Sequence, residues 1–530
     1  MAPPDADASL LPVPPAAGSS RDWTAWLFAG SVAAIALALV CQPFPPCVDY
    51  PQHLATAYSL LRALQGEHTG QLVWISFNGL FELATALLGL LLPLELAGRM
   101  VLALGFCLQP FAVWQLLRFA RRPAVYAFAW LPCAYSFCLA WGFVNFVLGA
   151  GLATCCLLAW FEQKPALRVW LLALATAYAH VLGGCFVLLG MGLGVLTRRR
   201  PWRALLPGVG LAAYLGLAYT QIGRVPRLER SWLVQFPRWS ERLPLHRTLL
   251  GSWAGPWDEL LAGALVAVLL GMCLTALLVR GSARWTAHGF TWLCCSVWLI
   301  YSVFPAVLDD CWSFFQRFGH VGVLWLPAAL PTFGHERRWR RLAEAPLLVL
   351  GLLAALNSVL HLCRGAEARD ASAILADIPR GSHVAPVSYD LSRQPMTDAA
   401  SWLHFAAYAI VRRDSEIPDI FARDHWTFPI HESWPPGVPL PPTSYQWQHI
   451  FDTSAAYARY FDVVLARTSD AKPNLDPRRQ IFGAQQDDAL LLSHHGRFWL
   501  YRFLADDAGS SAKQAHNDAP GALRRPARSL

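Results

Sequence analysis

A carboxylate, a proline and an imidazole are crowded into one short motif, Val48-Asp49-Tyr50-Pro51-Gln52-His53-Leu54, which follows the first membrane-length apolar segment. Ionisable groups close to a bilayer are costly to keep there and tend to mark function. Asp49 and His53 are four residues apart, which suits one face of a helix that begins at Pro51 or earlier. A carboxylate with a histidine beside it has the chemistry to remove the proton of a hydroxyl group. Two plainer explanations stay open: Asp49 as the cap of that helix, and His53 as a side chain that reaches the membrane interface.

Further polar residues lie at the ends of other apolar segments and are candidates for the same site. An arginine can hold a phosphate group, and amide, imidazole and carboxyl side chains can bind the remaining groups of a substrate. Each also has a structural explanation, as a turn residue, a helix end or a membrane anchor. The candidate substrate-binding residues are Asn145, His180, Arg317, Asp309, Asp310 and Glu82.

The composition indicates what kind of protein holds these residues. Of the 530 residues, 55% are hydrophobic and only 15% are charged, and the mean hydropathy is +0.35. Apolar segments of about 20 residues, long enough to cross a bilayer, recur from Trp23 to Leu362. The net charge of +8 does not indicate nucleic-acid binding, because the arginines cluster in short loops between apolar segments, where they orient helices. We therefore predict a polytopic α-helical membrane protein.

The basic clusters set the predicted topology, because Lys and Arg favour the cytosolic ends of helices. Placing every cluster in the cytosol gives about eleven transmembrane helices, with residues 1–20 as a disordered cytosolic tail. The clusters are Arg118/Arg121/Arg122, Arg198/Arg199/Arg200/Arg203, Arg280/Arg284 and Arg337/Arg338/Arg340/Arg341. The spans are Trp23–Cys41 and residues 97–117, 124–140, 143–161, 167–179, 181–197, 203–220, 259–279, 285–305, 319–333 and 344–362. The transmembrane domain as a whole is residues 21–362.

One apolar stretch does not fit as a span. A crossing at 72–93 would place the cluster around Arg118 on the wrong side, so we expect this stretch to lie in the interface. Asn78 and Glu82 lie within it, four residues apart and so on one face of a helix. Residues 52–65 suggest a second interfacial helix. The first external loop is thus predicted to run from 43 to 96 and to contain two interfacial helices.

The composition changes after Leu362, where strand-like and helix-like segments alternate. Residues 366–504 are predicted to form a small extracytoplasmic α/β domain, and the polar tail 505–530 is expected to be disordered. The expected strands of the α/β domain include residues 383–389, 461–467, 489–493 and 497–503, with His494-His495-Gly496 as a hairpin turn. An amphipathic helix is expected at 399–412. The sequence contains no phosphate-binding glycine loop, dinucleotide fingerprint or His-Glu-x-x-His zinc motif.

The layout resembles the GT-C superfamily of integral-membrane glycosyltransferases. The shared features are a first helix, a long first external loop that opens with an acidic motif, interfacial helices, many further spans and an external C-terminal domain. More narrowly, Asp49-Tyr50-Pro51-Gln52-His53-Leu54 together with Gly142-Phe143-Val144-Asn145-Phe146 is similar to bacterial GT-C-like membrane proteins. The resemblance covers residues 23 to 362, and the external domain follows by position only.

The resemblance implies an enzyme of the bacterial inner membrane that uses a polyprenyl-phosphate sugar donor and a glycan, lipid or protein acceptor on the extracytoplasmic side. Asp49 matches the acid of the first loop, which acts as a base or contacts a divalent cation such as Mg²⁺ or Mn²⁺. Arg317, His180 and Asn145 would contact the donor phosphate or the acceptor. The chain lacks a paired acid in the first loop and has Asn145 where many members have an acid, so both a metal-free site and a non-catalytic member stay open.

Two other functions remain as alternatives. One is a non-catalytic component of polysaccharide assembly and export. The other is a polysaccharide polymerase or ligase, which would rely on arginines in an external loop, and the segment 221–257 contains six. A transporter is less consistent with the sequence, because its polar groups would lie near mid-membrane and an inverted repeat would be visible.

Overall fold

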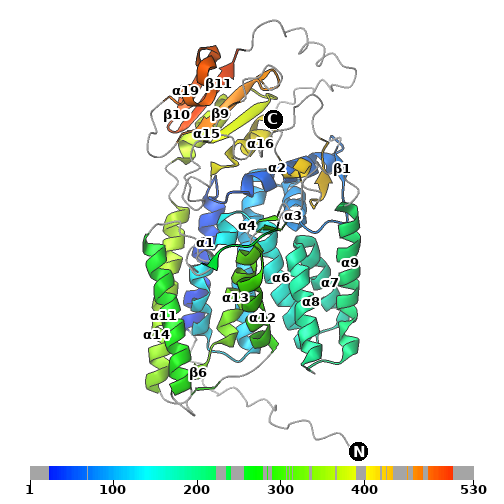
Figure 1. The fold of residues 1–530 in the computed structure, drawn as a ribbon, viewed down its shortest axis with the longest axis vertical. Coiled ribbons are helices and arrows are strands. Elements are labelled where there is room, and N and C mark those ends of the chain that lie inside the picture. Colours follow the sequence, from blue (N-terminus) through cyan, green and yellow to red (C-terminus); the bar gives the residue numbers. More distant parts are fainter. Residues whose placement is uncertain are drawn as a thin grey trace, which may run out of the picture.

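The fold is described from a computed structural model (Figure 1). The structure describes residues 23–67, 70–197, 199–222, 234–239, 256–278, 283–284, 289–305, 307–308, 311–312, 314–333, 337–363, 367–388, 402–417, 420–424, 427–433, 451, 458–468 and 476–504.

A bundle of apolar helices forms the larger part of the molecule (Figure 1). Within the described residues, five helices are long and apolar enough to cross a membrane. Three are α1 (Trp23–Cys41), α4 (Leu94–Phe119) and α6 (Val144–Phe161). The other two are α11 (Pro256–Leu278), through its segment Leu260–Leu278, and α14 (Arg337–Leu362), through its segment Arg341–Leu362. Shorter helices pack among them: α7 (Ala166–Ala179), α8 (Val181–Leu196), α9 (Leu206–Ile222), α12 (Gly289–Val303) and α13 (Phe314–Ala329). The number of membrane crossings stays a prediction.

The predicted continuous span at 124–140 is wrong. The chain there forms two 3-10 turns, η2 (Ala124–Ala129) and η3 (Leu131–Cys133), followed by the single helical turn α5 (Phe137–Ala140). Pro132 lies in the first turn of η3, where its missing backbone donor is tolerated, and Ser136 caps α5 by accepting from the N–H of Leu139. Each residue thus favours the start of a separate short turn. Nearly every side chain of the stretch is buried. The segment is therefore an irregular core element rather than a lipid-facing helix.

Two helices of the first loop lie across the upper end of the bundle in Figure 1, below the C-terminal domain. They are α2 (Tyr50–Leu64) and α3 (Leu80–Gly89). Proline in the first turn of α2 fits, because that position needs no backbone donor. The prediction of one interfacial helix over 72–93 is wrong in its bounds, because α3 is shorter. Glu82, which the sequence allowed either to line the site or to face water, is completely buried. Asn78 precedes the helix.

The C-terminal domain contains a four-stranded sheet in the order β10-β11-β9-β7. β7 (Val384–Ser388) and β9 (Val463–Arg467) are parallel, whereas β11 (Phe498–Phe503) is antiparallel to both β9 and β10 (Ala489–His495). The hairpin turn lies at Gly496-Arg497 and not at the predicted His494-His495-Gly496, because both histidines continue the strand. The expected helix at 399–412 is, over its described part, the 3-10 turn η7 (Phe405–Ala407) and α16 (Tyr408–Arg413).

The C-terminal domain is attached to the first loop by backbone pairing, ion pairs and aromatic packing. The strand β1 (Gln71–Leu72) pairs with β8 (Ile430–His431) of the domain. Arg412 forms a bidentate ion pair with Glu95, at 2.5 and 2.8 Å, at the start of α4. The Phe44 ring packs edge-on against Tyr408, with centroids 4.9 Å apart. These contacts fix the position of the domain above α2 and α3.

Candidate functional site

Asp49 lies at the start of α2, where its backbone is held against the short turn that precedes α6. The N–H groups of Val48 and Asp49 donate to the carbonyls of Ala140 and Trp141, both at 2.9 Å. Gly142 follows with φ +81°, and a Cβ there would lie 2.6 Å from the Asp49 nitrogen. Only glycine combines that backbone conformation with so close an approach. The acidic motif and the Gly142-Phe143-Val144-Asn145 motif therefore meet, although about 90 residues separate them.

The carboxylate of Asp49 does not cap α2. Asp49 occupies the N-cap position, but its side chain makes no capping hydrogen bond. Its Oδ1 instead lies 3.4 Å from Nε2 of His404, a residue of the C-terminal domain. The side chain of Asp49 keeps 15% of its surface exposed, whereas that of His404 keeps 4%. The acid is thus held at one oxygen and still reachable.

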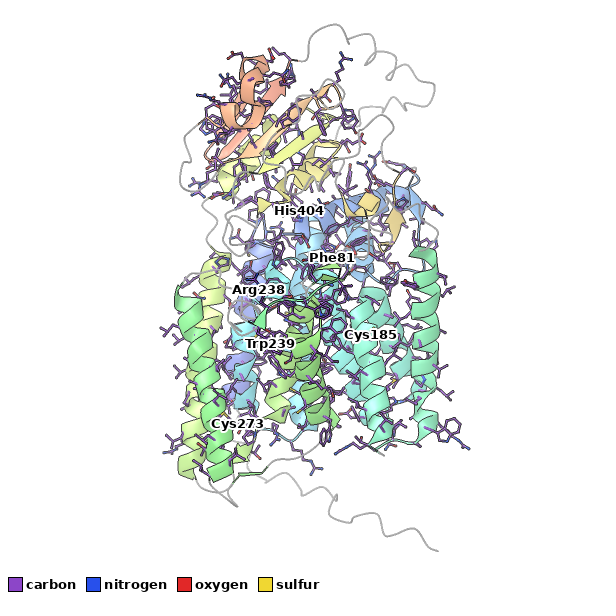
Figure 2. All side chains as sticks on the ribbon, in the orientation of Figure 1. Phe81, Cys185, Arg238, Trp239, Cys273 and His404 are labelled. Atoms are coloured by element: carbon purple, nitrogen blue, oxygen red, sulfur yellow. The ribbon has the colours of Figure 1, made fainter. Side chains whose placement is uncertain are left out.

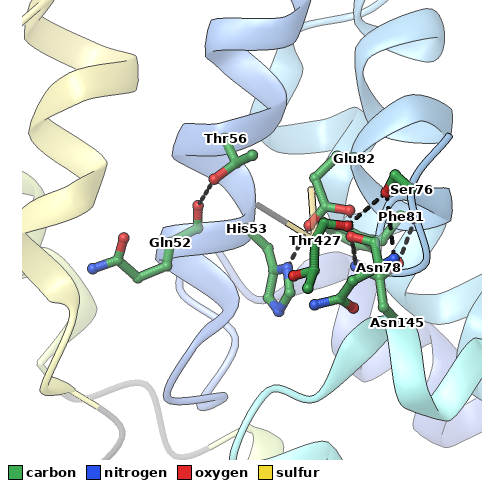
Figure 3. Close-up of polar contacts among 9 residues, drawn as sticks. All are labelled: Gln52, His53, Thr56, Ser76, Asn78, Phe81, Glu82, Asn145 and Thr427. Carbon is green, nitrogen blue, oxygen red and sulfur yellow. Dashed lines mark hydrogen bonds and ion pairs between the residues drawn. The ribbon is translucent and has the colours of Figure 1, made fainter. Parts of the chain in front are cut away.

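His53 lies one turn further along α2 and belongs to a different cluster, which is closed (Figure 3). Its Nδ1 is 2.5 Å from Oε1 of Glu82, and Asn145 Nδ2 donates to the other oxygen of Glu82 at 2.8 Å. Asn145 also accepts from the N–H of Phe81 at 2.8 Å and donates to the carbonyl of Asn78 at 3.1 Å. All three residues are at least 97% buried. The structure therefore places His53, Glu82 and Asn145 in a cluster that holds α2, α3 and α6 together.

His180 and Arg317 come together at the turn between α7 and α8. His180 Nδ1 accepts the N–H of Leu182 at 3.1 Å, so the ring hydrogen is on Nε2. Nη1 of Arg317 lies 3.4 Å from that Nε2, and an arginine can only donate. Two donors therefore face the same space. This is the arrangement that binds an anion such as a phosphate oxygen.

Phe143 connects Arg317 to the surroundings of Asp49. The guanidinium of Arg317 lies over the Phe143 ring, with Cζ 4.2 Å from its centroid. Phe143 directly follows Gly142, which contacts the Asp49 backbone. The turn from Trp141 to Phe143 thus has the predicted base on one side and the predicted phosphate-binding arginine on the other.

Some of the predicted residues cannot be placed. Asp309 and Asp310 lie outside the described residues, as do the arginines of the segment 221–257 apart from Arg238. Among the described residues there is no group of three or more His, Cys, Asp or Glu side chains that could hold a metal ion. Both oxygens of Glu82 already accept hydrogen bonds. The divalent cation that the resemblance allows therefore stays a prediction.

Sequence reasoning missed His404 and its partner Gln52. Gln52 is part of the acidic motif, but nothing local indicated that its amide would meet a histidine 352 residues later, at 3.3 Å. Figure 2 shows His404 at the junction between the sheet domain and the bundle. The only signal in the sequence was a histidine within an otherwise apolar segment, Trp402 to Ala407.

Comparison with known proteins shows a shared fold without close sequence relatives. No family model matches the chain, and no curated protein matches it. Two solved structures of ArnT from Cupriavidus metallidurans, one bound to undecaprenyl phosphate and one in the apo state, superpose with a TM-score of 0.51 each. Sequence identity is 12% and 13%, and each alignment covers 91% of this chain and 98% of ArnT. The chain therefore shares its fold with ArnT, and this agrees with the polytopic helical fold expected from the sequence.

Proposed function

We propose that this protein is a glycosyltransferase of the bacterial inner membrane that moves a sugar from a polyprenyl-phosphate carrier to a glycan, lipid or protein acceptor. The observation that supports this most is the convergence on Trp141–Phe143 of a reachable carboxylate and a pair of anion-binding donors. The ArnT structure with undecaprenyl phosphate supports the class of donor, because it shares the fold over 91% of this chain.

In the proposed reaction, the acceptor hydroxyl gives its proton to the carboxylate of Asp49. The acceptor oxygen attacks the anomeric carbon, and the bond from that carbon to the phosphate oxygen breaks with its electron pair. Arg317 and His180 Nε2–H donate to the departing phosphate, where the negative charge increases. Proton removal by a positioned base contributes about 10²–10⁴-fold to a rate.

The distribution of charge supports an extracytoplasmic site. The basic cluster at Arg118 follows α4 downward in Figure 1, and α14 starts at Arg337 at the same lower end. His404 and the C-terminal domain lie at the upper end, away from these clusters, and Asp49 is in contact with His404. Since basic residues favour the cytosolic side, we propose that the site faces the other compartment.

Substitution of Asp49 by Asn tests the proposal. The variant keeps the shape of the side chain but cannot act as a base, so transfer should fall by about 10³-fold. Full-length protein in lipid nanodiscs is incubated with a panel of radiolabelled polyprenyl-phosphate sugars and bacterial membranes as acceptor. Binding of undecaprenyl phosphate, measured by quenching of tryptophan fluorescence, should be unchanged.

The possible outcomes separate the alternatives. Undiminished transfer by Asp49→Asn would eliminate the role of this carboxylate. If the wild-type protein binds undecaprenyl phosphate but transfers none of the labelled sugars, the non-catalytic component of polysaccharide export becomes the better explanation. Transfer of whole lipid-linked glycans, rather than single sugars, would favour the polymerase or ligase.

A further inference from the structure

The C-terminal domain supplies a residue to the site formed by the bundle. We propose that His404 is a positioning residue, which fixes the carboxylate of Asp49 so that one oxygen is held and the other meets the acceptor. The proposal rests on the proposed function, because it assigns the partner of the base in that reaction. His404 Nε2 lies 3.4 Å from Asp49 Oδ1, and its Nδ1 lies 3.3 Å from the amide nitrogen of Gln52.

The two contacts of the His404 ring define where its proton lies. The amide N–H of Gln52 donates to Nδ1, so Nδ1 is an acceptor and carries no hydrogen. The ring hydrogen is then on Nε2, which faces Asp49 Oδ1. His404 therefore donates to the carboxylate and holds it, as a second residue does for many catalytic groups. It does not remove the acceptor's proton itself, because its remaining ring nitrogen is engaged by Gln52.

The spacing of the acidic motif explains why one histidine can bind both residues. Asp49 and Gln52 are three residues apart at the first turn of α2, so both side chains are on the side of the helix that meets His404. The N–H of His53 donates to the Asp49 carbonyl at 3.1 Å and continues the helix from that residue. The carboxylate thus has a fixed backbone below it and an imidazole from the other domain beside it.

His404 is held in place by its own domain. It directly precedes η7 and α16, and α16 contains Arg412, which is bound to Glu95 of the bundle. The His404 side chain is almost fully buried and lines a pocket with Trp402, Phe405 and Arg467 on the domain side. Burial and the contact with Gln52 thus hold the ring beside Asp49 in the docked molecule. The site is therefore complete only in the docked molecule.

Three substitutions of His404 separate positioning from a general structural role. Glutamine places an amide nitrogen near the Nε2 position and keeps a donor to Asp49, whereas asparagine is too short and alanine has no donor. In the nanodisc transfer assay, His404→Gln should keep most of the wild-type kcat. His404→Asn and His404→Ala should lower kcat by about 10–100-fold, because loss of orientation of a reacting group costs up to about 10². KM for the donor should change little, since Arg317 and His180 are untouched.

Equal losses in all three variants, or a wild-type kcat in His404→Ala, would overturn the proposal. His495→Ala is the control. His495 lies on the β10–β11 hairpin and is paired with Asp377, so this substitution should leave kcat unchanged.

A second measurement does not depend on activity. It therefore distinguishes failure of the His404 proposal from failure of the proposed function. The Tm of the full chain is measured for His404→Ala, Asp49→Ala and the double variant. If the two side chains are bonded, the effects are not additive, and His404→Ala changes Tm less in the Asp49→Ala background. Additive changes would mean that the contact is absent, whatever the enzyme transfers.

Discussion

The α2–α3–α6 junction and the turn between α7 and α8 both bury polar side chains, but their hydrogen bonds are completed differently. At the junction, Glu82 has a donor for each oxygen, from His53 and Asn145. At the turn, His180 and Arg317 direct two donors toward each other at 3.4 Å. The first cluster holds acceptors and donors in balance. The second brings two donors together, and we propose that a ligand with acceptor oxygens binds there.

This difference separates stability from binding. A buried polar cluster whose groups are all paired stabilises one arrangement of the elements around it, and loss of one member leaves buried groups unpaired. A contact between two donors, such as that of His180 with Arg317, is expected to stabilise the fold less than a contact between a donor and an acceptor. We therefore expect Glu82, His53 and Asn145 to stabilise the framework, and we propose His180 and Arg317 as substrate-binding residues.

The largest expected effect is on the closed cluster. Glu82→Ala removes both acceptors and leaves His53 Nδ1–H and one Asn145 N–H without that partner, so the free energy of unfolding should fall by about 3–5 kcal/mol. Thermal unfolding of the full chain in detergent, followed by tryptophan fluorescence, measures the change in Tm. The control is Glu162→Ala, which removes a surface pair with Lys164 (3.4 Å) that contributes little. Similar Tm values for the two variants would show that the Glu82 cluster stabilises the fold no more than a surface ion pair does.

The next effect should appear in binding instead of stability. Arg317→Met keeps an apolar chain over the Phe143 ring but removes the donor, so the affinity for undecaprenyl phosphate should fall by about 10–100-fold, or about 1.5–3 kcal/mol. Titration in nanodiscs measures the Kd, and Tm should stay within the range of surface variants. Arg118→Met is the matched control, because Arg118 is exposed at the opposite end of α4. A large loss of Tm with unchanged Kd would place Arg317 in the framework.

The smallest effect concerns a cluster in the C-terminal domain whose hydrogen bonds depend on pH. His383 lies between Asp462 and Glu416, each at 3.2 Å. Burial opposes its protonation, but the bonds to Asp462 and Glu416 outweigh burial and raise the pKa of His383 to about 9. The protonated ring stabilises the folded domain fully below the ordinary histidine pKa of about 6.5, and this contribution is lost as the pH rises through about 9.

Thermal unfolding at pH 6, 7.5, 9 and 10 tests this third cluster. The Tm should fall by a few degrees, about 2–4 °C, over the alkaline half of the series. In His383→Gln this part of the pH dependence should disappear. If the Tm of His383→Gln falls at alkaline pH as much as that of the wild-type chain, the His383 cluster does not cause the pH dependence.

The sequence could predict those parts of the fold that follow from local patterns. Apolar length placed α1, α4 and α6 within a few residues of their observed ends. Asp49, His180 and Arg317 lie around the turn from Trp141 to Phe143, whereas the side of the membrane on which they lie stays a prediction. Periodicity could not predict the break at 124–140, because that segment is apolar throughout and its turns depend on single residues such as Ser136. An apolar stretch without polar interruptions looks the same whether it is a helix or a series of turns.

The site could be predicted only as a set of candidates. Asn78 and Glu82 have helical spacing, but Asn78 precedes α3 and Glu82 is buried under α2, where it meets Asn145. The contact of Asp49 with His404 depends on how a second domain docks, and no pattern within either segment reports it. Long-range partners of this kind require the tertiary structure.

The pairing of β1 with β8 has a consequence for how the protein is made. Gln71 and Leu72 bond to His431 and Ile430, which the ribosome adds some 360 residues later. Until then the strand has an open edge, and such edges are where newly made chains pair wrongly. The loop that carries the acid must therefore wait, during membrane insertion, for almost the whole chain. Nascent chains that end before β8 should show this loop open to proteases, and its protection would mark the moment at which β1 and β8 have paired.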